Sequence, residues 1–263
     1  MDLKKLLPQV RAAVIESGTL IQEAWDKPRK VRYKGRIDLV TETDVAVEHD
    51  VKARLAKILP EASFLAEESA ADAPLNDLTW VIDPIDGTTN FTHQVPFVCT
   101  SVGLWHKGRV VLGVINAPIM NECFYAAAGC GAWCNDKQIF VTKNDNLEQS
   151  LIATGFPYTI AEDADEITDR LRRVLQGAQG IRRLGAAALD LAYLAAGRFD
   201  AFYEYSLNPW DVAAGSFIVE RAGGKVSDFQ GGDNYLFGKE IIATNSNVFS
   251  EFIEIVENII YEK

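Results

Sequence analysis

The chain has 263 residues, of which 48% are hydrophobic, enough for a large buried core, and it carries a formal net charge of −11. This acidic balance disfavours direct contact with nucleic acid or anionic lipid, because both are negatively charged. No apolar run approaches the roughly 18 residues that a membrane-spanning helix needs. The first residues lack the apolar core of a signal peptide, and four cysteines do not suggest a disulfide scaffold. We therefore expect a cytoplasmic protein.

The first half of the chain is predicted to begin with two helices. The spacing of apolar residues from Leu6 to Ile21 predicts a helix over 3–26. A second helix is predicted from Thr43 to Leu59, where Pro60 ends it, with Thr41 or Thr43 as its N-cap.

Strands are predicted next. Short apolar runs at 64–66 and 80–82 each end at acidic residues. Runs at 97–105 and 109–116 flank a Lys107-Gly108 turn and predict a hairpin, and residues 122–127 extend this antiparallel sheet.

After about residue 145, strands and helices alternate. Strands are predicted at 151–154, 181–183, 201–205 and 241–244, and helices at 163–176, 186–196, 210–222 and 247–260. This alternation favours a layered α/β half. We therefore predict an α+β domain over 1–145 and an α/β domain over 146–263, with a site between them.

The most informative segment is DPIDGTTNF, residues 83–91. Pro84 is expected to stop the ladder of the strand before it, and Pro96 limits a helix that begins at Thr88 to about two turns. Two carboxylates at a strand end suit a hard cation such as Mg2+, and backbone N–H groups of a Gly-Thr turn suit phosphate. A solvated turn is the simpler interpretation of an isolated Asp-x-x-Asp.

Other carboxylates occur in comparable places. Glu67 and Glu68 follow the apolar run 64–66, Asp211 opens a small-residue helix, and Asp44 lies in the segment before the second helix. Each has an alternative explanation as a solvated or helix-capping residue.

Five strings together resemble the inositol monophosphatase family, within the larger fructose-1,6-bisphosphatase-like superfamily. They are DLVTETD (38–44), AEES (66–69), DPIDGTTNF (83–91), GAAALDLAYLAAGRFDAFYE (185–204) and PWDVAAG (209–215). They occur in the family's order, and the resemblance covers essentially the whole chain. It implies a layered αβαβα sandwich of the sugar-phosphatase type, with an antiparallel-rich first half and an α/β second half.

The resemblance also implies roles for individual residues. The metal ligands would be Glu67, Asp83, Asp86, Asp211 and the carbonyl of Ile85. The amides of Gly87 and Thr88 would hold the phosphate. Thr88, backed by Asp44 and acting with Glu67, would orient the attacking water. The cyclitol or sugar would contact Gly185, Ala186, Ala187 and Glu204. Glu67, Ile85, Asp86 and Asp211 would also belong to the substrate-binding set.

The implied activity is hydrolysis of a phosphate monoester, with inositol 1-phosphate as the leading substrate. Two or three Mg2+ ions would activate a water for in-line attack and stabilise the leaving alkoxide. The family also implies a homodimer and inhibition by Li+. Ala186, in place of a common Ser or Thr, and Asn208, in place of the His of animal enzymes, lie where the alcohol is selected.

Several alternatives remain open at this point. A fructose-1,6-bisphosphatase, a nucleotide 3′-phosphatase or a histidinol-phosphatase would use the same chemistry, and a protein-binding regulatory role belongs to another class. Cys130 and Cys134 are spaced as half of a zinc site, but no second pair follows, so zinc is not expected. The arginines between 170 and 183 could bind a second anion, or could form a solvated helix face.

Overall fold

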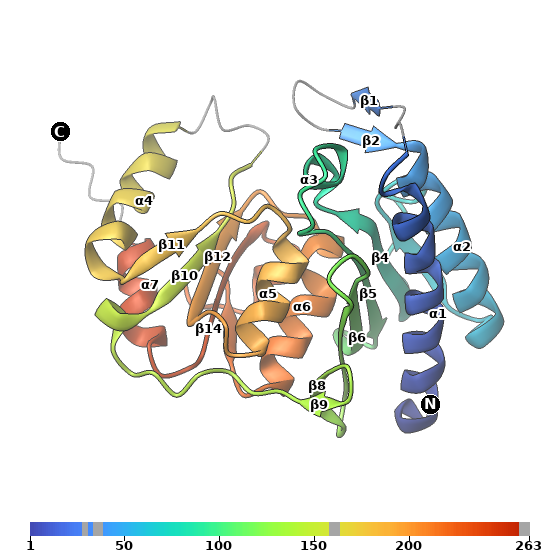
Figure 1. Ribbon diagram of the computed structural model, residues 1–263. Coiled ribbons are helices and arrows are strands. Elements are labelled where there is room, and N and C mark those ends of the chain that lie inside the picture. The colour runs from blue at the N-terminus through green and yellow to red at the C-terminus, as the bar shows by residue number, and fades with distance from the viewer. Residues whose placement is uncertain (28–30, 34–38, 158–163, 258–263) are drawn as a thin grey trace.

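The computed structural model describes residues 1–27, 31–33, 39–157 and 164–257. It is a five-layer αβαβα sandwich, as the resemblance implied (Figure 1). Helices α1 (Leu3–Ala24) and α2 (Glu42–Ile58) cover the outer face of one sheet. Helices α5 (Ala187–Ala195) and α6 (Pro209–Arg221) fill the space between the two sheets, and α4 (Ala164–Gly177) and α7 (Phe249–Glu257) cover the far side.

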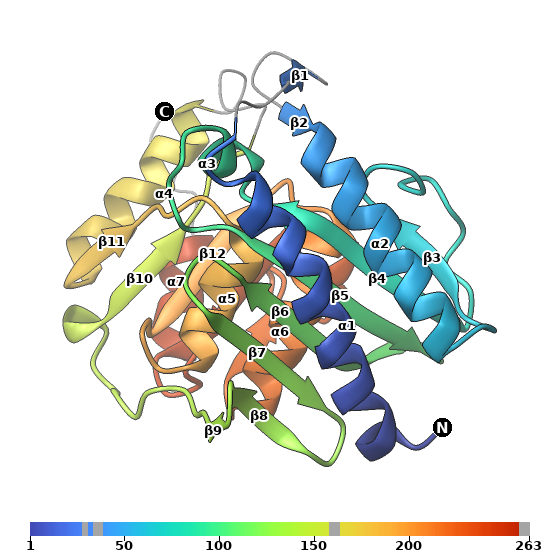
Figure 2. The same ribbon diagram turned by 45° about the vertical axis from the view of Figure 1, so that its right-hand side comes forward.

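The first sheet has seven strands and is antiparallel apart from one pair. In spatial order they are β3 (Ser63–Ala66), β4 (Leu78–Asp86), β5 (Cys99–His106), β6 (Arg109–Ala117), β7 (Glu122–Ala127), β8 (Gly131–Cys134) and β9 (Lys137–Gln138). Strands β3 and β4 run parallel, so their carboxyl ends lie at the same edge of the sheet. The acidic residues that follow or end these two strands are therefore brought together. Figure 2 shows α1 and α2 side by side across this sheet.

The second sheet has five strands, in the order β11 (Gly180–Arg182), β10 (Leu151–Thr154), β12 (Ala201–Tyr205), β14 (Glu240–Thr244) and β13 (Lys225–Ser227). Its β10 pairs are parallel, and its β14 pairs are antiparallel. The strands predicted for the second half are thus present. The sequence did not predict β13, β8 or β9, or the small pair β1 (Val31–Tyr33) and β2 (Leu39–Thr41).

Small residues let α6 lie very close to the first sheet. A Cβ at Gly113 would be 2.8 Å from the carbonyl oxygen of Ala214, and one at Gly103 would be 3.1 Å from the Cβ of Ala213. Interior contacts of this kind are as dense as those in organic crystals. The alanines of PWDVAAG therefore set the depth of α6, and Asp211 in its first turn is fixed with it.

One local expectation was wrong. Strand β4 does not stop at Pro84 but pairs again at Asp86 with Cys99, after an irregularity that begins at Asp83. The hydroxyl of Thr100 donates to the Pro84 carbonyl at 2.8 Å, which holds the segment on the sheet although proline has no N–H. Helix α3 (Thr88–Thr92), with five residues, stays within the limit of about two turns that Pro96 was expected to set.

The remaining predicted elements agree with the structure within a few residues. The last predicted helix, 247–260, is α7 at 249–257 within the described residues, and residues 258–260 lie outside them. No helix in the described part of the chain is long and apolar enough to cross a membrane. The division into domains at residue 145 stays a prediction.

Candidate active site

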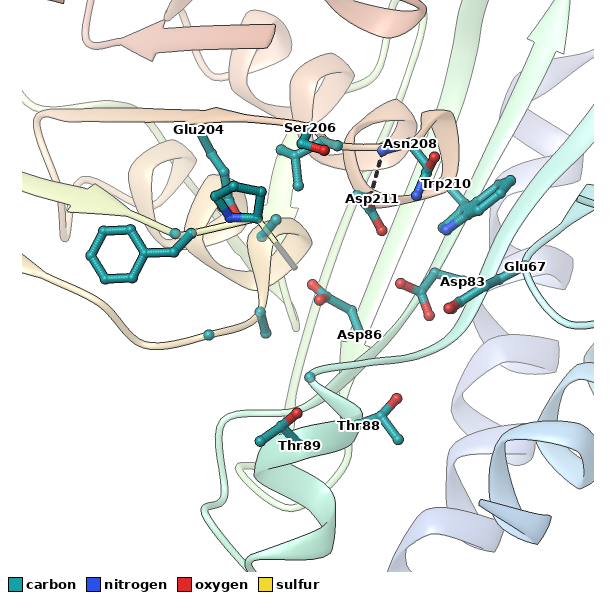
Figure 3. A pocket seen from close by; sticks show the side chains of 18 of the residues that line it. Glu67, Asp83, Asp86, Thr88, Thr89, Glu204, Ser206, Asn208, Trp210 and Asp211 are labelled. Atoms are coloured by element: carbon teal, nitrogen blue, oxygen red, sulfur yellow. Dashed lines mark hydrogen bonds between the residues drawn. The ribbon is translucent and has the colours of Figure 1, made fainter. Parts of the chain in front are cut away.

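A cavity of about 370 Å3 lies where β3 and β4 end, against α3 and the first turns of α5 and α6. All but one of the residues predicted for the site line it. These are Glu67, Asp83, Ile85, Asp86, Gly87, Thr88, Gly185, Ala186, Ala187, Glu204 and Asp211. The exception, Asp44, lies behind Thr88. Figure 3 shows the carboxyl groups of Glu67, Asp83, Asp86 and Asp211 around a common space.

Asp83 is the most constrained of these carboxylates. It lies in β4 and is 2% exposed, and its Oδ1 is buried with no hydrogen-bond partner in the described structure. Burial raises the pKa of Asp83 well above its usual range, and the nearby carboxylates of Glu67 and Asp86 raise it further. Burying an acceptor without a hydrogen-bond donor costs free energy, so this oxygen is a candidate ligand for a cation.

Asp86 is held by the start of α5. Its Oδ2 accepts a hydrogen bond of 2.6 Å from the N–H of Ala188, in the first turn of that helix. Burial raises the pKa of Asp86 to about 7, although backbone hydrogen bonds from the α5 terminus oppose the rise. Helix N-termini carry partial positive charge, so α5 stabilises a carboxylate that burial alone would protonate.

Asp211 and Glu67 reach the same space from other elements. In the first turn of α6, Asp211 Oδ2 accepts a 2.7 Å hydrogen bond from the N–H of Asn208. It is therefore both a helix-capping residue and a pocket residue, and the two interpretations of its sequence position are compatible. Glu67 follows β3, where its N–H donates to the carbonyl of Ile82 at 3.2 Å.

Thr88 and Asp44 form the pair that the sequence predicted. Asp44 Oδ1 accepts a 2.9 Å hydrogen bond from the Thr88 hydroxyl, while Oδ2 accepts from the N–H of Thr41 at 2.8 Å. The second contact belongs to the capping box of α2, so Asp44 also serves as a helix-terminal residue. Burial raises the pKa of Asp44, and the Thr41 and Thr88 donors oppose that rise. The Thr88 hydroxyl also lies 3.0 Å from the Ile85 carbonyl oxygen, and its single proton serves one acceptor at a time.

Gly87 and Asn90 position α3 against the second half of the chain. Gly87 has a φ of +91°, and a Cβ there would be 2.9 Å from the carbonyl oxygen of Phe97. The Asn90 side chain donates to the carbonyls of Phe97 and Leu184, both at 2.8 Å. The DGTTN segment is therefore fixed to the turn that carries Gly185.

The opposite wall of the pocket carries Glu204, at the end of β12. Its carboxyl is buried, and burial raises its pKa to about 8, although the Arg183 guanidinium lowers it. A Cβ at Gly155 would lie 2.1 Å from both Glu204 carboxyl oxygens, so only glycine leaves room for them. This carboxyl can donate or accept a hydrogen bond near neutral pH.

Some pocket residues were not predicted as site residues. They are Thr89, Gly155, Phe156, Pro157, Arg183, Tyr205, Ser206, Leu207 and Trp210, whereas Asn208, which the resemblance placed in the region that selects the alcohol, also lines the pocket. One buried acid in α5, Asp190, was also not predicted. It is 1% exposed, and its Oδ1 has no partner in the described structure. Burial raises the pKa of Asp190 well above the usual range, and the charge of Glu204 raises it further. Its sequence signal was a single acid within the apolar string AALDLAYLAA.

The oxygen-rich lining fits a hard divalent cation. Such cations take carboxylate and carbonyl oxygens, and Asp83 Oδ1 is a buried oxygen of this type with no donor in the described structure. Among the described residues, however, no three His, Cys, Asp or Glu side chains form a ready-made site for one ion. Like charges repel in a buried space, and Asp86 and Asp211 each accept from a backbone N–H. A bound cation would be needed to draw the carboxylates together.

Comparison with known proteins gives the family. The model of the inositol monophosphatase family matches residues 2–261. The chain belongs to the inositol monophosphatase family. It is 40% identical over 249 residues to inositol monophosphatase 2 of Solanum lycopersicum, covering 92% of this chain and 94% of that protein. It is also 40% identical over 232 residues to Nus factor SuhB of Pseudomonas aeruginosa, covering 86% of each.

A solved structure agrees with this assignment. The extragenic suppressor protein suhB of Bartonella henselae superposes with a TM-score of 0.90 at 36% identity, covering 99% of this chain and all of that one. The family resemblance and the fold class are therefore confirmed. The membership supports a phosphatase of the inositol monophosphatase type.

Proposed function

We propose that this family member hydrolyses a phosphate monoester of a cyclitol or sugar, with Mg2+ as cofactor and inositol 1-phosphate as the leading substrate. The observation that carries the proposal is Asp83, a buried carboxylate with an unpartnered oxygen, within a pocket that also holds Glu67, Asp86 and Asp211. This lining would repel a phosphate ester, so a cation is an electrostatic requirement for binding.

The chain supplies a distinct group for each task. Glu67, Asp83, Asp86, Asp211 and the Ile85 carbonyl would hold two or three Mg2+ ions, which polarise the phosphate and activate water when bound. The Thr88 hydroxyl donates a hydrogen bond to Asp44, and Thr88 would orient the attacking water together with Glu67. The amides of Gly87 and Thr88, at the start of α3, would hold phosphate oxygens, since the first N–H groups of a helix have no intrahelical acceptor.

The alcohol would lie on the opposite side of the pocket. Gly185, Ala186 and Ala187 form a turn that leads into α5, and Glu204 faces them with a protonatable carboxyl. Because Ala186 presents no hydroxyl, selection of the alcohol depends more on Glu204. Ring hydroxyls are suited to such a group because they both donate and accept hydrogen bonds.

Asp83→Asn tests the metal-dependent mechanism. The variant should lose phosphate release from inositol 1-phosphate by at least about a thousandfold, because it removes an anionic cation ligand. Glu220→Gln, in α6 but outside this pocket, is the matched control and should keep wild-type turnover. Phosphate release by Asp83→Asn at the wild-type rate would refute the scheme.

A substrate panel tests the choice of alcohol. Inositol 1-phosphate, fructose 1,6-bisphosphate, adenosine 3′,5′-bisphosphate and histidinol phosphate are compared by kcat/KM with Mg2+, with and without Li+. We expect the highest value for inositol 1-phosphate and inhibition by Li+. A strong preference for the nucleotide would favour the 3′-phosphatase alternative.

A regulatory role is the second candidate, and the name of the Pseudomonas relative, Nus factor SuhB, favours it. In that case the protein would bind a protein partner. Purified protein that is inert toward the whole panel would support this role over the enzyme. We further propose a cytoplasmic homodimer, which light scattering of the purified protein would test.

A further inference from the structure

We propose that Arg183 and Phe156 form a subsite for a second phosphate on the leaving group, so that the pocket discriminates bisphosphorylated from monophosphorylated sugars. This inference rests on the proposed phosphatase function. It concerns the wall of the pocket that faces the alcohol, away from Asp83 and Thr88.

Arg183 is the single cation among the described residues that line the pocket. Its guanidinium carbon lies 5.6 Å from the centroid of the Phe156 ring, within the range of a cation–π contact, which leaves the N–H donors at the guanidinium edge available. Within the described part of the chain, Arg183 makes no hydrogen bond or ion pair. Its neighbour Arg182 differs in this respect, because it donates to the Ile181 carbonyl at 3.0 Å.

The backbone places the guanidinium beside the alcohol-binding turn. A Cβ at Gly185 would lie 2.4 Å from Arg183 Nη1, and the φ of +90° at Gly185 also disfavours a side chain. Arg183 therefore packs directly against the turn that precedes Ala186 and Ala187. A group carried by the alcohol, a few bonds from the scissile phosphate, could reach it.

The electrostatics of this wall favour an anion at Arg183. Of the four carboxylates that would bind cations, Glu67 and Asp83 lie farthest from Glu204, and Asp86 and Asp211 lie between them and Glu204 (Figure 3). On the Arg183 side, burial keeps Glu204 largely protonated at neutral pH, with its pKa at about 8, and Asp190 is buried beside it with a raised pKa. A protonated Glu204 carboxyl does not neutralise the guanidinium, and Arg binds phosphate through two parallel hydrogen bonds.

A simpler role must be distinguished from this one. Arg183 lowers the pKa of both Glu204 and Asp190, so it could act only by tuning those two carboxyls. In that case its removal would change the hydrolysis of mono- and bisphosphates by the same factor. A subsite for the second phosphate predicts unequal factors.

The test uses two substrates that differ only in the second phosphate, fructose 1-phosphate and fructose 1,6-bisphosphate. The measured quantity is the ratio of kcat/KM for the bisphosphate to that for the monophosphate, with saturating Mg2+. Arg183→Gln should lower this ratio at least about tenfold, the value of one lost charge-assisted hydrogen bond at a partly exposed site. Arg183→Lys should give an intermediate ratio, and Arg182→Gln should leave it at the wild-type value.

An unchanged ratio in Arg183→Gln would overturn the proposal, and so would an equal loss for both substrates. If the wild-type protein hydrolyses neither sugar phosphate, the proposed function fails for these substrates, and calorimetric binding of both sugar phosphates in the presence of Mg2+ decides the subsite. Tighter binding of the bisphosphate that is lost in Arg183→Gln would support it. Equal affinities of the wild-type protein for the two sugars would refute it.

Discussion

Glu204→Gln should stabilise the metal-free protein, and the gain should grow with pH. The Glu204 carboxyl is 8% exposed, and burial raises its pKa from 4.5 to about 8. Between these two values the folded protein keeps a proton that the unfolded chain has lost. The free energy of unfolding therefore falls as pH rises through this window. Gln cannot ionise and has nearly the same shape, so the variant lacks this loss and still fits over Gly155.

The magnitude follows from the width of the window. Each pH unit corresponds to about 1.4 kcal/mol, so a window of three to four units gives a ceiling of about 5 kcal/mol at pH 8. Below pH 4.5 the two proteins should differ little. Urea unfolding in the presence of EDTA, followed by fluorescence at half-unit steps from pH 5 to pH 8, measures the difference directly.

Glu122→Gln provides a control of opposite sign. The Arg198 guanidinium holds the pKa of Glu122 below its usual value, so the charged form stabilises the folded state. Replacing Glu122 should destabilise the protein at neutral pH, and this loss of stability should shrink as pH falls toward the pKa of Glu122 in the folded protein.

If the stability difference between Glu204→Gln and wild type stays constant from pH 5 to pH 8, the Glu204 carboxyl does not hold its proton and the reasoning fails.

Two further predictions concern the pocket. Mg2+ affinity should fall about tenfold per pH unit below pH 7, because burial raises the pKa of Asp86 to about 7 and the ion must displace the proton of this carboxyl. Calorimetry between pH 6 and pH 8 measures this dependence. The affinity would show no such slope if Asp86 is not a ligand. Thr88→Val should keep the fold but lower kcat about a hundredfold, because it removes the hydroxyl that donates a hydrogen bond to Asp44. Thr88→Ser should restore kcat. A Val variant with wild-type kcat would exclude Thr88 from water positioning.

The sequence predicted the side of the pocket that carries Glu67, Asp83 and Asp86 better than the side that carries Phe156 and Arg183. Asp83, Asp86 and Glu67 are at or just beyond the ends of two apolar runs, and the parallel pairing of β3 and β4 brings such ends together. Short motifs with a fixed backbone path carry this information locally. The string 83–91 therefore specified both its carboxylates and the turn after them.

The wall that carries Phe156 and Arg183 depends on contacts between distant segments. Phe156 follows β10 and Arg183 follows β11, and their contact requires that these strands be neighbours, which the alternation of elements did not specify. The expectation that the strand stops at Pro84 was wrong for a related reason. The hydroxyl of Thr100, from the next strand, donates to the Pro84 carbonyl and holds this residue on the sheet although it has no N–H, and a rule based on local sequence cannot include that contact.

The arrangement of helix termini explains how the chain tolerates so many acids in one place. The first turn of α5 donates to Asp86, and the first turn of α6 brings the N–H of Asn208 to Asp211, so both carboxylates gain hydrogen bonds and a favourable dipole. Asp83 gains no comparable donor for its Oδ1. The energetic cost of the metal-free pocket is thus concentrated on this oxygen. A bound cation would relieve that cost only in the folded state, so part of its binding free energy should appear as increased stability of the fold.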